Sequence, residues 1–247
     1  MSRTAISEDL KNRLANEVQH GATEIAVRQA EYGWSSPAGE IRSRRRIEFL
    51  VKGLPRDAAV LEVGAGTGVQ TEKLLKFLDN ITGIDISDDL LSHARKRAPQ
   101  AQYRVMDAHA LELADSSIDA VMGVSILHHL EWDKCLEECF RVLRPGGVVR
   151  FSEPNLLNPQ IYLQKNIPFL KRLAGDSPDE YAFTKRQIVR ALEKASFEKI
   201  SVKPYEFLHP STPRSLIPIV VKIEKLVSAT PLVEIAGSLL IEAYKPR

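Results

Sequence analysis

Short apolar runs rich in β-branched residues alternate along the chain with longer stretches in which apolar residues recur at helical spacing. Runs of the first kind predict buried strands, and stretches of the second kind predict amphipathic helices. Such an alternation is typical of an α/β fold built on one mostly parallel sheet. The predicted strands are Val60–Val63, Ile81–Ile86, Gln102–Val105, Ser117–Val124, Val148–Phe151, Phe197–Glu206 and Gly237–Tyr244, and the predicted helices include Glu40–Leu50, Val69–Phe77, Asp89–Arg97, Glu131–Leu143 and Lys185–Ala195.

The first predicted strand runs into a glycine-rich turn, which reads V-L-E-V-G-A-G-T-G over Val60–Gly68. A strand, a glycine-rich turn and a helix form a ligand-binding corner in open α/β sheets, because glycine lets a ligand approach the main chain. The dinucleotide-binding fingerprint would require a glycine at position 69, where this chain has Val69. The carboxylate of Glu62 would also repel a pyrophosphate, whereas it would attract a cation.

This turn resembles the first motif of class I S-adenosylmethionine-dependent methyltransferases. The sequence L-R-P-G-G at 143–147, ahead of an apolar strand, is similar to the ubiquinone-methyltransferase-like branch of that family, which acts on small molecules and lipids. The resemblance covers Ala59–Glu153 with specific motifs and the remainder only by topology. It implies a Rossmann-like α/β fold with a seven-stranded sheet in the order 3-2-1-4-5-7-6, strand 7 being antiparallel, and S-adenosyl-L-methionine as the cofactor.

The resemblance gives cofactor-binding roles to residues at the ends of the first four strands. It implies that Glu62 helps to hold the ammonium group, that Asp85 binds the ribose hydroxyls, and that Asp107 binds the adenine amino group. All three partners are donors, and a carboxylate accepts hydrogen bonds, so these pairings are chemically consistent. The predicted cofactor-binding set is Glu62, Gly64, Ala65, Gly66, Gly68, Asp85, Ile86, Met106, Asp107, Ala108 and Val124.

Three other side chains near this edge of the sheet are candidates for a general base. His128 and His129 follow the fourth strand, and imidazole titrates near neutral pH. In the family, one such histidine often only packs under the cofactor. Glu153 ends the fifth strand on the same side and is a candidate for the base or for substrate contact. A base is not obligatory, because positioning alone can supply about 7–11 kcal/mol of a barrier.

Residues 1–55 are predicted to form a helical cover over the ligand cleft, as in related methyltransferases, and Ser7–Ala30 reads as one or two helices. Tyr32 and Trp34 follow in a turn. They are candidates for lining the acceptor site, with simple packing as the equal alternative.

The predicted helix Glu40–Leu50 carries four arginines within five positions. Because they wrap around the helix, they cannot all contact one ligand, and a solvated face is the expectation. The alternative is that one of them binds an anionic substrate. These residues are Arg42, Arg44, Arg45 and Arg46.

Two segments, 155–182 and 207–236, fall outside the alternation and are predicted insertions that shape the acceptor site. The first is amphipathic with basic residues, and the second is strongly apolar between prolines. Two apolar insertions beside one pocket suggest a lipid-like acceptor, and their basic residues would suit peripheral contact with an anionic membrane surface. A larger core or a dimer face are the alternatives.

The composition narrows the remaining options. A net charge of +2 predicts no nucleic-acid partner. No signal segment and no apolar run long enough to cross a membrane are recognisable, so a cytoplasmic location is expected, with membrane association only at the surface. Cys135 and Cys139 lie one helical turn apart without further ligands, so we expect half-buried free thiols and no metal.

These features predict one methyltransferase domain over residues 1–247, acting on a small-molecule acceptor. The acceptor, the methylated atom and the oligomeric state stay open. An NAD(P)-dependent oxidoreductase is one alternative, which Val69 and Glu62 disfavour. A non-catalytic S-adenosylmethionine-binding protein is the other, which the intact glycines and acids disfavour.

Overall fold

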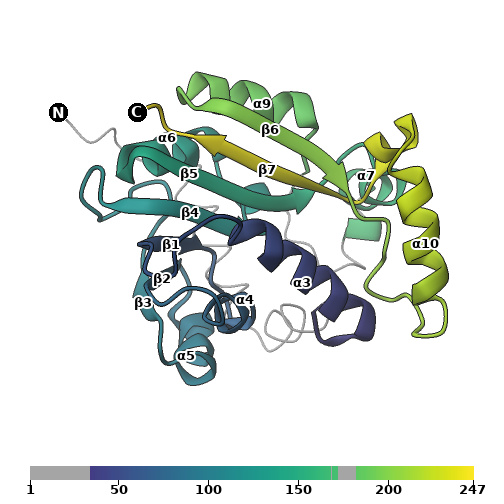
Figure 1. Ribbon diagram of the computed structural model, residues 1–247, viewed down its shortest axis with the longest axis horizontal. Coiled ribbons are helices and arrows are strands. Elements are labelled where there is room, and N and C mark those ends of the chain that lie inside the picture. The colour runs from purple at the N-terminus through teal and green to yellow at the C-terminus, as the bar shows by residue number, and fades with distance from the viewer. Residues whose placement is uncertain (1–33, 168, 172–181) are drawn as a thin grey trace.

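The computed structural model describes residues 34–167, 169–171 and 182–247. A seven-stranded sheet in the order β3-β2-β1-β4-β5-β7-β6 forms its centre (Figure 1). β7 runs antiparallel to β5 and to β6, and the other pairs are parallel, so the predicted order and directions are confirmed. The strands are β1 (Val60–Val63), β2 (Ile81–Asp85), β3 (Gln102–Val105), β4 (Ile118–Val124), β5 (Leu143–Pro154), β6 (Glu198–Tyr205) and β7 (Ser238–Tyr244).

β5 begins five residues earlier than the sequence predicts. Leu143 pairs with Ile118, and Val148 pairs with Ala120, so β4 advances by two residues while β5 advances by five. The extra residues include Gly146 at a φ of 81°, whose N–H donates to the carbonyl of Lys245 at 3.0 Å. The predicted proline–glycine turn is therefore an irregularity within a longer strand.

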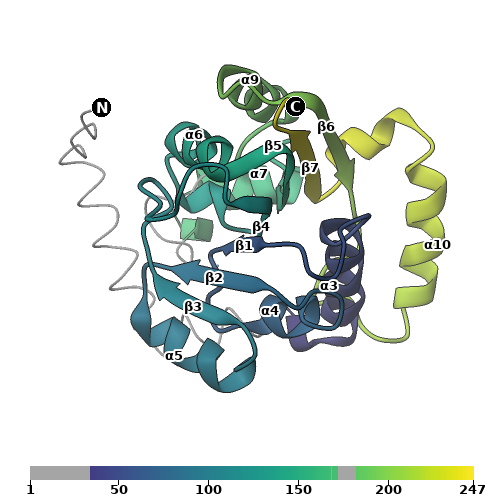
Figure 2. The ribbon, with the colours of Figure 1, turned by 60° about the vertical axis from the view of Figure 1, so that its left-hand side comes forward.

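Helices cover both faces of the sheet (Figure 2). α3 (Pro37–Leu50) and α4 (Val69–Leu74) pack on one face against a cluster that includes Val60, and α5 (Asp88–Arg97) packs beside them against β2 and β3. α6 (Trp132–Val142) and α9 (Lys185–Lys194) pack on the other face against a cluster that includes Leu61. Val60 and Leu61 are neighbours in β1, and they enter opposite layers because strand side chains alternate in direction.

Polar caps fix where three of these helices begin. The Ser87 hydroxyl accepts a hydrogen bond from the Leu90 N–H ahead of α5, and Ser36 caps α3 in the same way. Thr184 and Gln187 form a reciprocal capping box at α9. Each cap satisfies a donor that the first turn of a helix leaves unpaired, so the starts of α5 and α9 lie within one residue of the predicted positions.

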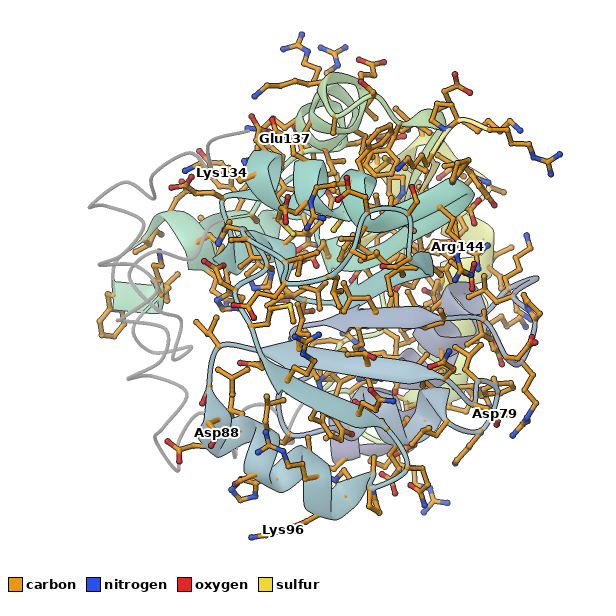
Figure 3. The ribbon with its side chains drawn as sticks, turned by 90° about the vertical axis from the view of Figure 1, so that its left-hand side faces the viewer. Asp79, Asp88, Lys96, Lys134, Glu137 and Arg144 are labelled. Carbon is orange, nitrogen blue, oxygen red and sulfur yellow. The ribbon has the colours of Figure 1, made fainter. Side chains whose placement is uncertain are left out.

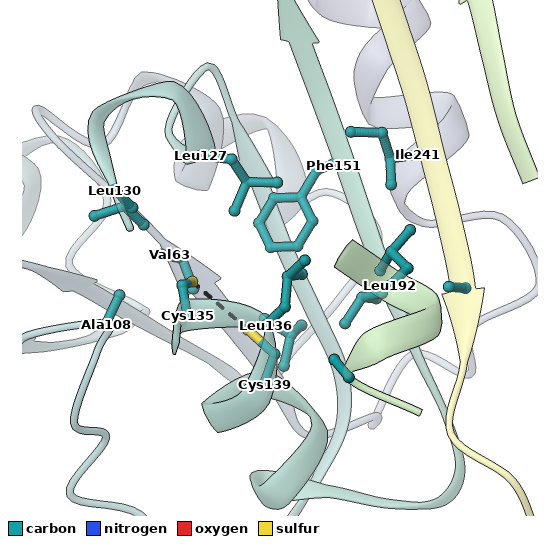
Figure 4. Packing of buried hydrophobic residues seen from close by; sticks show 14 of the residues in the cluster. Val63, Ala108, Leu127, Leu130, Cys135, Leu136, Cys139, Phe151, Leu192 and Ile241 are labelled. Carbon is teal, nitrogen blue, oxygen red and sulfur yellow. Dashed lines mark hydrogen bonds between the residues drawn. The ribbon is translucent and has the colours of Figure 1, made fainter. Parts of the chain in front are cut away.

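The larger hydrophobic cluster lies between the sheet and the helices α6 and α9 (Figure 4). Phe151 of β5 is fully buried there, together with Leu136 and Leu192 from the two helices. Cys135 and Cys139 are fully buried, not half-buried as predicted, and their Sγ atoms lie 3.9 Å apart. The contact with Cys139 and the burial raise the pKa of the Cys135 thiol, so both free thiols act as apolar packing groups.

The two predicted insertions contain short helices outside the sheet layers. The first contains α7 (Pro159–Asn166), none of whose residues is buried. The second contains α10 (Ile217–Val227) and the 3-10 helix η2 (Pro231–Ile235), and α10 lies beyond α3 in both ribbon views. No helix among the described residues could span a membrane. The predicted helices within Ser7–Ala30 lie outside the described residues.

Candidate functional site

The turn after β1 is built from three glycines in the left-handed region, with φ values of 70°, 52° and 78° at Gly64, Gly66 and Gly68. A Cβ atom on Gly64 would lie 2.5 Å from Cγ1 of Ile126, and one on Gly68 would lie 2.9 Å from Cα of Ala94. A Cβ atom on Gly66 would meet nothing within 4 Å. Gly64 and Gly68 are therefore required by packing, whereas Gly66 faces open space that a ligand could enter.

Glu62 lies in β1 just before this turn and is buried. Its Oε2 accepts a hydrogen bond from Oγ1 of Thr71 at 2.6 Å. Burial raises the pKa of Glu62 to about 7, Thr71 opposes this shift, and the nearby Asp85 adds to it. A buried carboxylate without a cation is costly, so a positively charged ligand would complement this position.

Asp85, at the end of β2, is tied to the same turn. Its Oδ2 accepts from the Gly66 N–H at 3.0 Å, and its Oδ1 accepts from the Ser87 N–H at 3.0 Å. Burial raises its pKa, while the backbone donors Ser87, Gly66 and Ile86 lower it. A carboxylate has about four lone-pair sites, so this side chain keeps acceptor capacity for a ligand hydroxyl. The structure thus brings Glu62, Gly66 and Asp85 together, as the sequence predicts, with Ile86 next in the chain.

Asp107 follows β3 and is held by His109, a residue that the sequence analysis did not single out. Oδ1 of Asp107 accepts from the backbone N–H of His109 at 2.9 Å and from its Nδ1 at 2.6 Å. Nε2 of His109 accepts from the Glu131 N–H at 2.9 Å, which fixes the proton of the neutral ring on Nδ1. Burial alone would raise the pKa of Asp107, but the hydrogen bonds from His109 lower it, so this acid stays ionised.

The two residues that flank Asp107 in the chain lie in the hydrophobic core. Met106 and Ala108 are buried members of the larger core cluster, and the Met106 N–H donates to the carbonyl of Asp85 at 3.0 Å. These two residues hold the β3 end in place beneath the site. The only short-range signal for His109 is its spacing of two residues from an aspartate, which allows the local hydrogen bond of an Asx turn.

Glu153, at the end of β5, organises the short helix η1 (Leu127–His129). Its Oε1 accepts from the N–H groups of Ile126 and Leu127 at 2.9 and 3.0 Å. Its Oε2 lies 2.9 Å from Nδ1 of His128, which is buried. Burial raises the pKa of Glu153 to about 7, although the backbone donors oppose the shift. Glu153 is therefore a positioning group whose two oxygens are already engaged.

His129 is half-buried, and its ring centroid lies 4.2 Å from that of His128. Its charge lowers the pKa of both Asp85 and Glu153, so the ring lies within electrostatic reach of the donor side and of the β5 end. Val124, at the end of β4, is half-buried beside this turn. Of the three predicted base candidates, His129 is the most exposed to solvent.

Trp34 packs on a buried arginine at the edge where β5 and β6 end. The Arg46 guanidinium carbon lies 5.1 Å from the Trp34 ring centroid and 5.4 Å from that of Tyr205. The Tyr205 hydroxyl contacts Oγ of Ser152 in β5 at 2.8 Å, and burial raises the pKa of Tyr205 to about 12. Trp34 therefore packs on Arg46 at the predicted acceptor side. Tyr32, the other predicted substrate residue, lies outside the described residues.

Three of the four arginines of α3 contradict the expected solvated face, and only Arg44 lies on it. Arg46, which is 2% exposed, pairs with Glu206 at 2.6 Å, and Arg42 pairs with the same carboxylate at 3.2 Å. Arg45 pairs with Glu224 of α10 at 2.9 Å. The prediction was wrong because both acids come from distant parts of the chain and lie over the helix.

This group of five residues, Arg42, Arg45, Arg46, Glu206 and Glu224, is called the α3 ion network below. Glu206 follows β6 with a φ of 74°, a strained conformation for a residue other than glycine. Its carbonyl accepts from the Gly237 N–H at 2.8 Å. Burial lowers the pKa of Arg42 to about 10. The network joins α3 and α10 to the carboxyl end of β6, which is the edge that carries the site.

Comparisons with known proteins agree with this geometry. Residues 61–151 match the family of methyltransferase domains. A demethylmenaquinone methyltransferase of Tropheryma whipplei is 31% identical over 182 residues, which cover 66% of this chain and 76% of that protein. A probable S-adenosylmethionine-dependent methyltransferase of Mycolicibacterium smegmatis is 36% identical over 116 residues, 45% of each chain.

Solved structures show the same fold at lower identity. A possible histamine N-methyltransferase from Thermotoga maritima has a TM-score of 0.65 and 19% identity, covering 93% of this chain and 98% of that one. Phosphoethanolamine N-methyltransferase 2 of Haemonchus contortus, in complex with S-adenosyl-L-methionine, has a TM-score of 0.70 and 17% identity, covering 100% of this chain and 62% of that one.

The described residues fit S-adenosylmethionine. Gly66 leaves room for a ligand at the main chain, and the buried carboxylate of Glu62 has no cationic partner in the described part of the chain, where such a donor would supply one. Asp85 and Asp107 keep acceptor capacity at the neighbouring strand ends. From this geometry, the matched domain and the identity to the Tropheryma protein, the chain belongs to the S-adenosylmethionine-dependent methyltransferases.

Proposed function

We propose that this protein methylates a small apolar or lipid-like acceptor, with quinones of the demethylmenaquinone type as the first class to test. The observation that carries the donor half is the pair of acids, buried Glu62 and half-buried Asp85, around the open position of Gly66. The acceptor half is supported by the relatives named demethylmenaquinone methyltransferase and by the apolar insertions that follow β5 and β6.

In this proposal the donor is held by the predicted cofactor-binding residues. Glu62 faces the ammonium group, Asp85 accepts from the ribose hydroxyls beside Ile86, and Asp107 accepts from the adenine amino group. His109 contributes by keeping Asp107 ionised and oriented. The donor supplies a methyl group already activated by its sulfonium, so the protein has to align the acceptor and exclude water.

For the acceptor side, the proposal separates the three base candidates by role. Glu153 and His128 form a buried pair that fixes η1, so they position the end of β4. His129 is the residue that would accept a proton from an oxygen acceptor. Its half-buried position, in contrast to the buried His128 and Glu153, supports this assignment.

The donor half is tested by differential scanning fluorimetry of the full chain with S-adenosylhomocysteine and with NAD⁺. Stabilisation by the first ligand alone is expected, and stabilisation by the dinucleotide alone would restore the oxidoreductase alternative. The acceptor half is tested by incubation with a labelled methyl donor and demethylmenaquinone or a lipid extract. Donor binding without transfer to any extract fraction would favour a non-catalytic binding protein.

Two histidine variants test the division of roles. His129→Asn should lower kcat while the affinity for S-adenosylhomocysteine stays within about twofold, because the side chain is not assigned to the donor. His128→Leu removes the partner of Glu153 and should lower the melting temperature as well. Unchanged turnover in His129→Asn would remove the base from the proposal and leave transfer by positioning alone.

A further inference from the structure

The outward face of α10 carries an uninterrupted line of apolar side chains. Leu216, Ile219, Ile223 and Leu226 follow one another at intervals of three or four residues, and between 47% and 67% of each is exposed. This spacing places them on one side of the helix. The four residues are called the α10 stripe. A monomeric protein rarely leaves such a continuous apolar surface in water, so the stripe points to a partner.

The charges around the stripe all have one sign. Glu224 is the only acid of α10, and it is turned inward, where it pairs with Arg45 and accepts from the Phe207 N–H at 3.0 Å. Arg214, Lys222 and Lys225 are exposed, and none of them pairs with an acid in the described part of the chain. The outward face therefore combines apolar groups with unneutralised cations.

The first insertion extends this surface. Nε2 of Gln160 lies 3.1 Å from Nε2 of His209, and Nδ2 of Asn158 donates to the carbonyl of Ile235 at 2.9 Å, so α7 lies against the second insertion. Figure 1 shows α7 and α10 at the same end of the molecule. Residues 155–171 contain no acid. Their exposed apolar side chains are Leu157, Tyr162, Leu163, Ile167 and Phe169.

We propose that the α10 stripe and the exposed side of α7 dock on an anionic lipid bilayer, with α10 lying in the plane of the headgroups. Apolar side chains would enter the boundary of the acyl chains, and Arg214, Lys222 and Lys225 would meet anionic headgroups. A second copy of the chain fits less well, because a two-fold interface would place the same cations opposite each other.

Docking on a bilayer would bring the protein to a lipid-like acceptor, and this role of the docking rests on the proposed function. The α3 ion network fixes α10 to Arg45 and, through Glu206 and Arg46, to Tyr205 at the carboxyl end of β6. The docking surface on α10 is therefore rigidly connected to the edge of the sheet where the acceptor would react. A lipid-like acceptor could pass from the bilayer to this edge without crossing water.

Vesicle binding of the full chain tests the docking without any turnover. Co-sedimentation is measured with phosphatidylcholine vesicles that contain phosphatidylglycerol and with phosphatidylcholine alone. Binding to the anionic vesicles should exceed binding to the neutral ones and should fall as salt rises. Lys222→Glu/Lys225→Glu should weaken the partition coefficient by about 30-fold or more, since each lysine near an anionic surface contributes about fivefold.

Matched variants on the far side of the molecule serve as controls. Lys76→Glu/Lys96→Glu makes the same charge change at exposed positions, and Figure 3 shows Lys96 pointing outward from α5. Leu226→Ser removes an exposed side chain of the stripe, and Phe77→Ser is its control, because 47% of Phe77 is exposed beyond α4. The stripe variants should lose vesicle binding, and the controls should keep it.

Three results would overturn the docking. They are equal binding to neutral and anionic vesicles, equal loss in the stripe and control variants, and a stable dimer that Leu226→Ser dissociates. The last would assign the stripe to a second copy. Affinity for S-adenosylhomocysteine is measured in every variant. Its retention, together with lost vesicle binding, separates the docking surface from the donor site, so failure of one proposal does not depend on failure of the other.

Discussion

At the scale of single residues, the buried carboxylate of Glu62 should couple donor binding to pH. Its pKa is raised to about 7 by burial, and a ligand ammonium group would favour the ionised form. Below pH 7 the ligand must displace a proton. We therefore expect the affinity for S-adenosylhomocysteine to increase about tenfold from pH 6 to pH 8, measured by isothermal titration calorimetry. Glu62→Gln should bind weakly with little dependence on pH, and a parallel rise in the variant would contradict the assignment.

Gly64 and Gly66 differ in the space around them and should differ in the effect of an added methyl group. Both have positive φ, so alanine at either position costs about 1–2 kcal/mol of backbone strain. Gly64→Ala also forces a contact with Ile126 and should cost roughly 1–3 kcal/mol more. Gly66→Ala should remain folded and lose donor affinity instead. Urea titration and calorimetry separate the two effects, and normal donor binding by Gly66→Ala would count against a ligand at this position.

At the scale of elements, the α3 ion network should dominate the attachment of α3 and α10 to the sheet. Glu206→Gln leaves Arg46 buried without its counter-ion and should lower the free energy of unfolding by about 3–5 kcal/mol. Glu48→Gln is the matched control, because Glu48 pairs with Arg44 on the solvent side of the same helix and should change stability by less than about 0.5 kcal/mol. The free energy of unfolding is measured by denaturant titration. Similar decreases in the two variants would mean that the buried ion pairs do not stabilise the attachment of α3 and α10.

The same network includes contacts that the sequence could not predict. The periodicity of Glu40–Leu50 predicted a helix, and a helix is present from Pro37 to Leu50. The environment of its arginines could not be predicted, because Glu224 hydrogen-bonds to Arg45 from 179 residues further along the chain. The second insertion was predicted to be apolar, but the side of α10 that faces solvent depends on distant contacts, those of Ile217 with Leu208 and those of the inward Glu224 with Arg45.

At the scale of the whole molecule, the sequence predicted the sheet order and the placement of the main acids. Local apolar runs predict the buried strands, and their order followed from the resemblance to class I methyltransferases. Asp85 could be placed beside the glycine turn because both lie at carboxyl ends of adjacent strands. Contacts between side chains of distant segments could not be predicted from the sequence. The pairing of Glu153 with η1 depends on how β4 and β5 end side by side, which no local pattern encodes.

Two buried acids should make the stability of the free protein depend on pH. Burial raises the pKa of Glu62 and of Glu153 from 4.5 to about 7. Between these values the folded chain holds more protons than the unfolded chain, so the free energy of unfolding falls as the pH rises through this window. Each acid contributes on the order of 3 kcal/mol, lost by about pH 7. Asp107 has the opposite sign, since its lowered pKa gives stability that is lost only in stronger acid.

Urea titrations at pH 5 and pH 8 test this balance. The midpoint of the free protein should be higher at pH 5, and Glu62→Gln/Glu153→Gln should have nearly equal midpoints. Saturating S-adenosylhomocysteine should raise the midpoint more at pH 8 than at pH 5, because it binds the ionised form of Glu62 and removes the penalty of that buried charge. A midpoint that increases with pH in the free protein and in the double variant alike would show that other groups control stability. In that case the free protein would not be destabilised by the ionised carboxylate of Glu62, and donor binding could not relieve such a destabilisation.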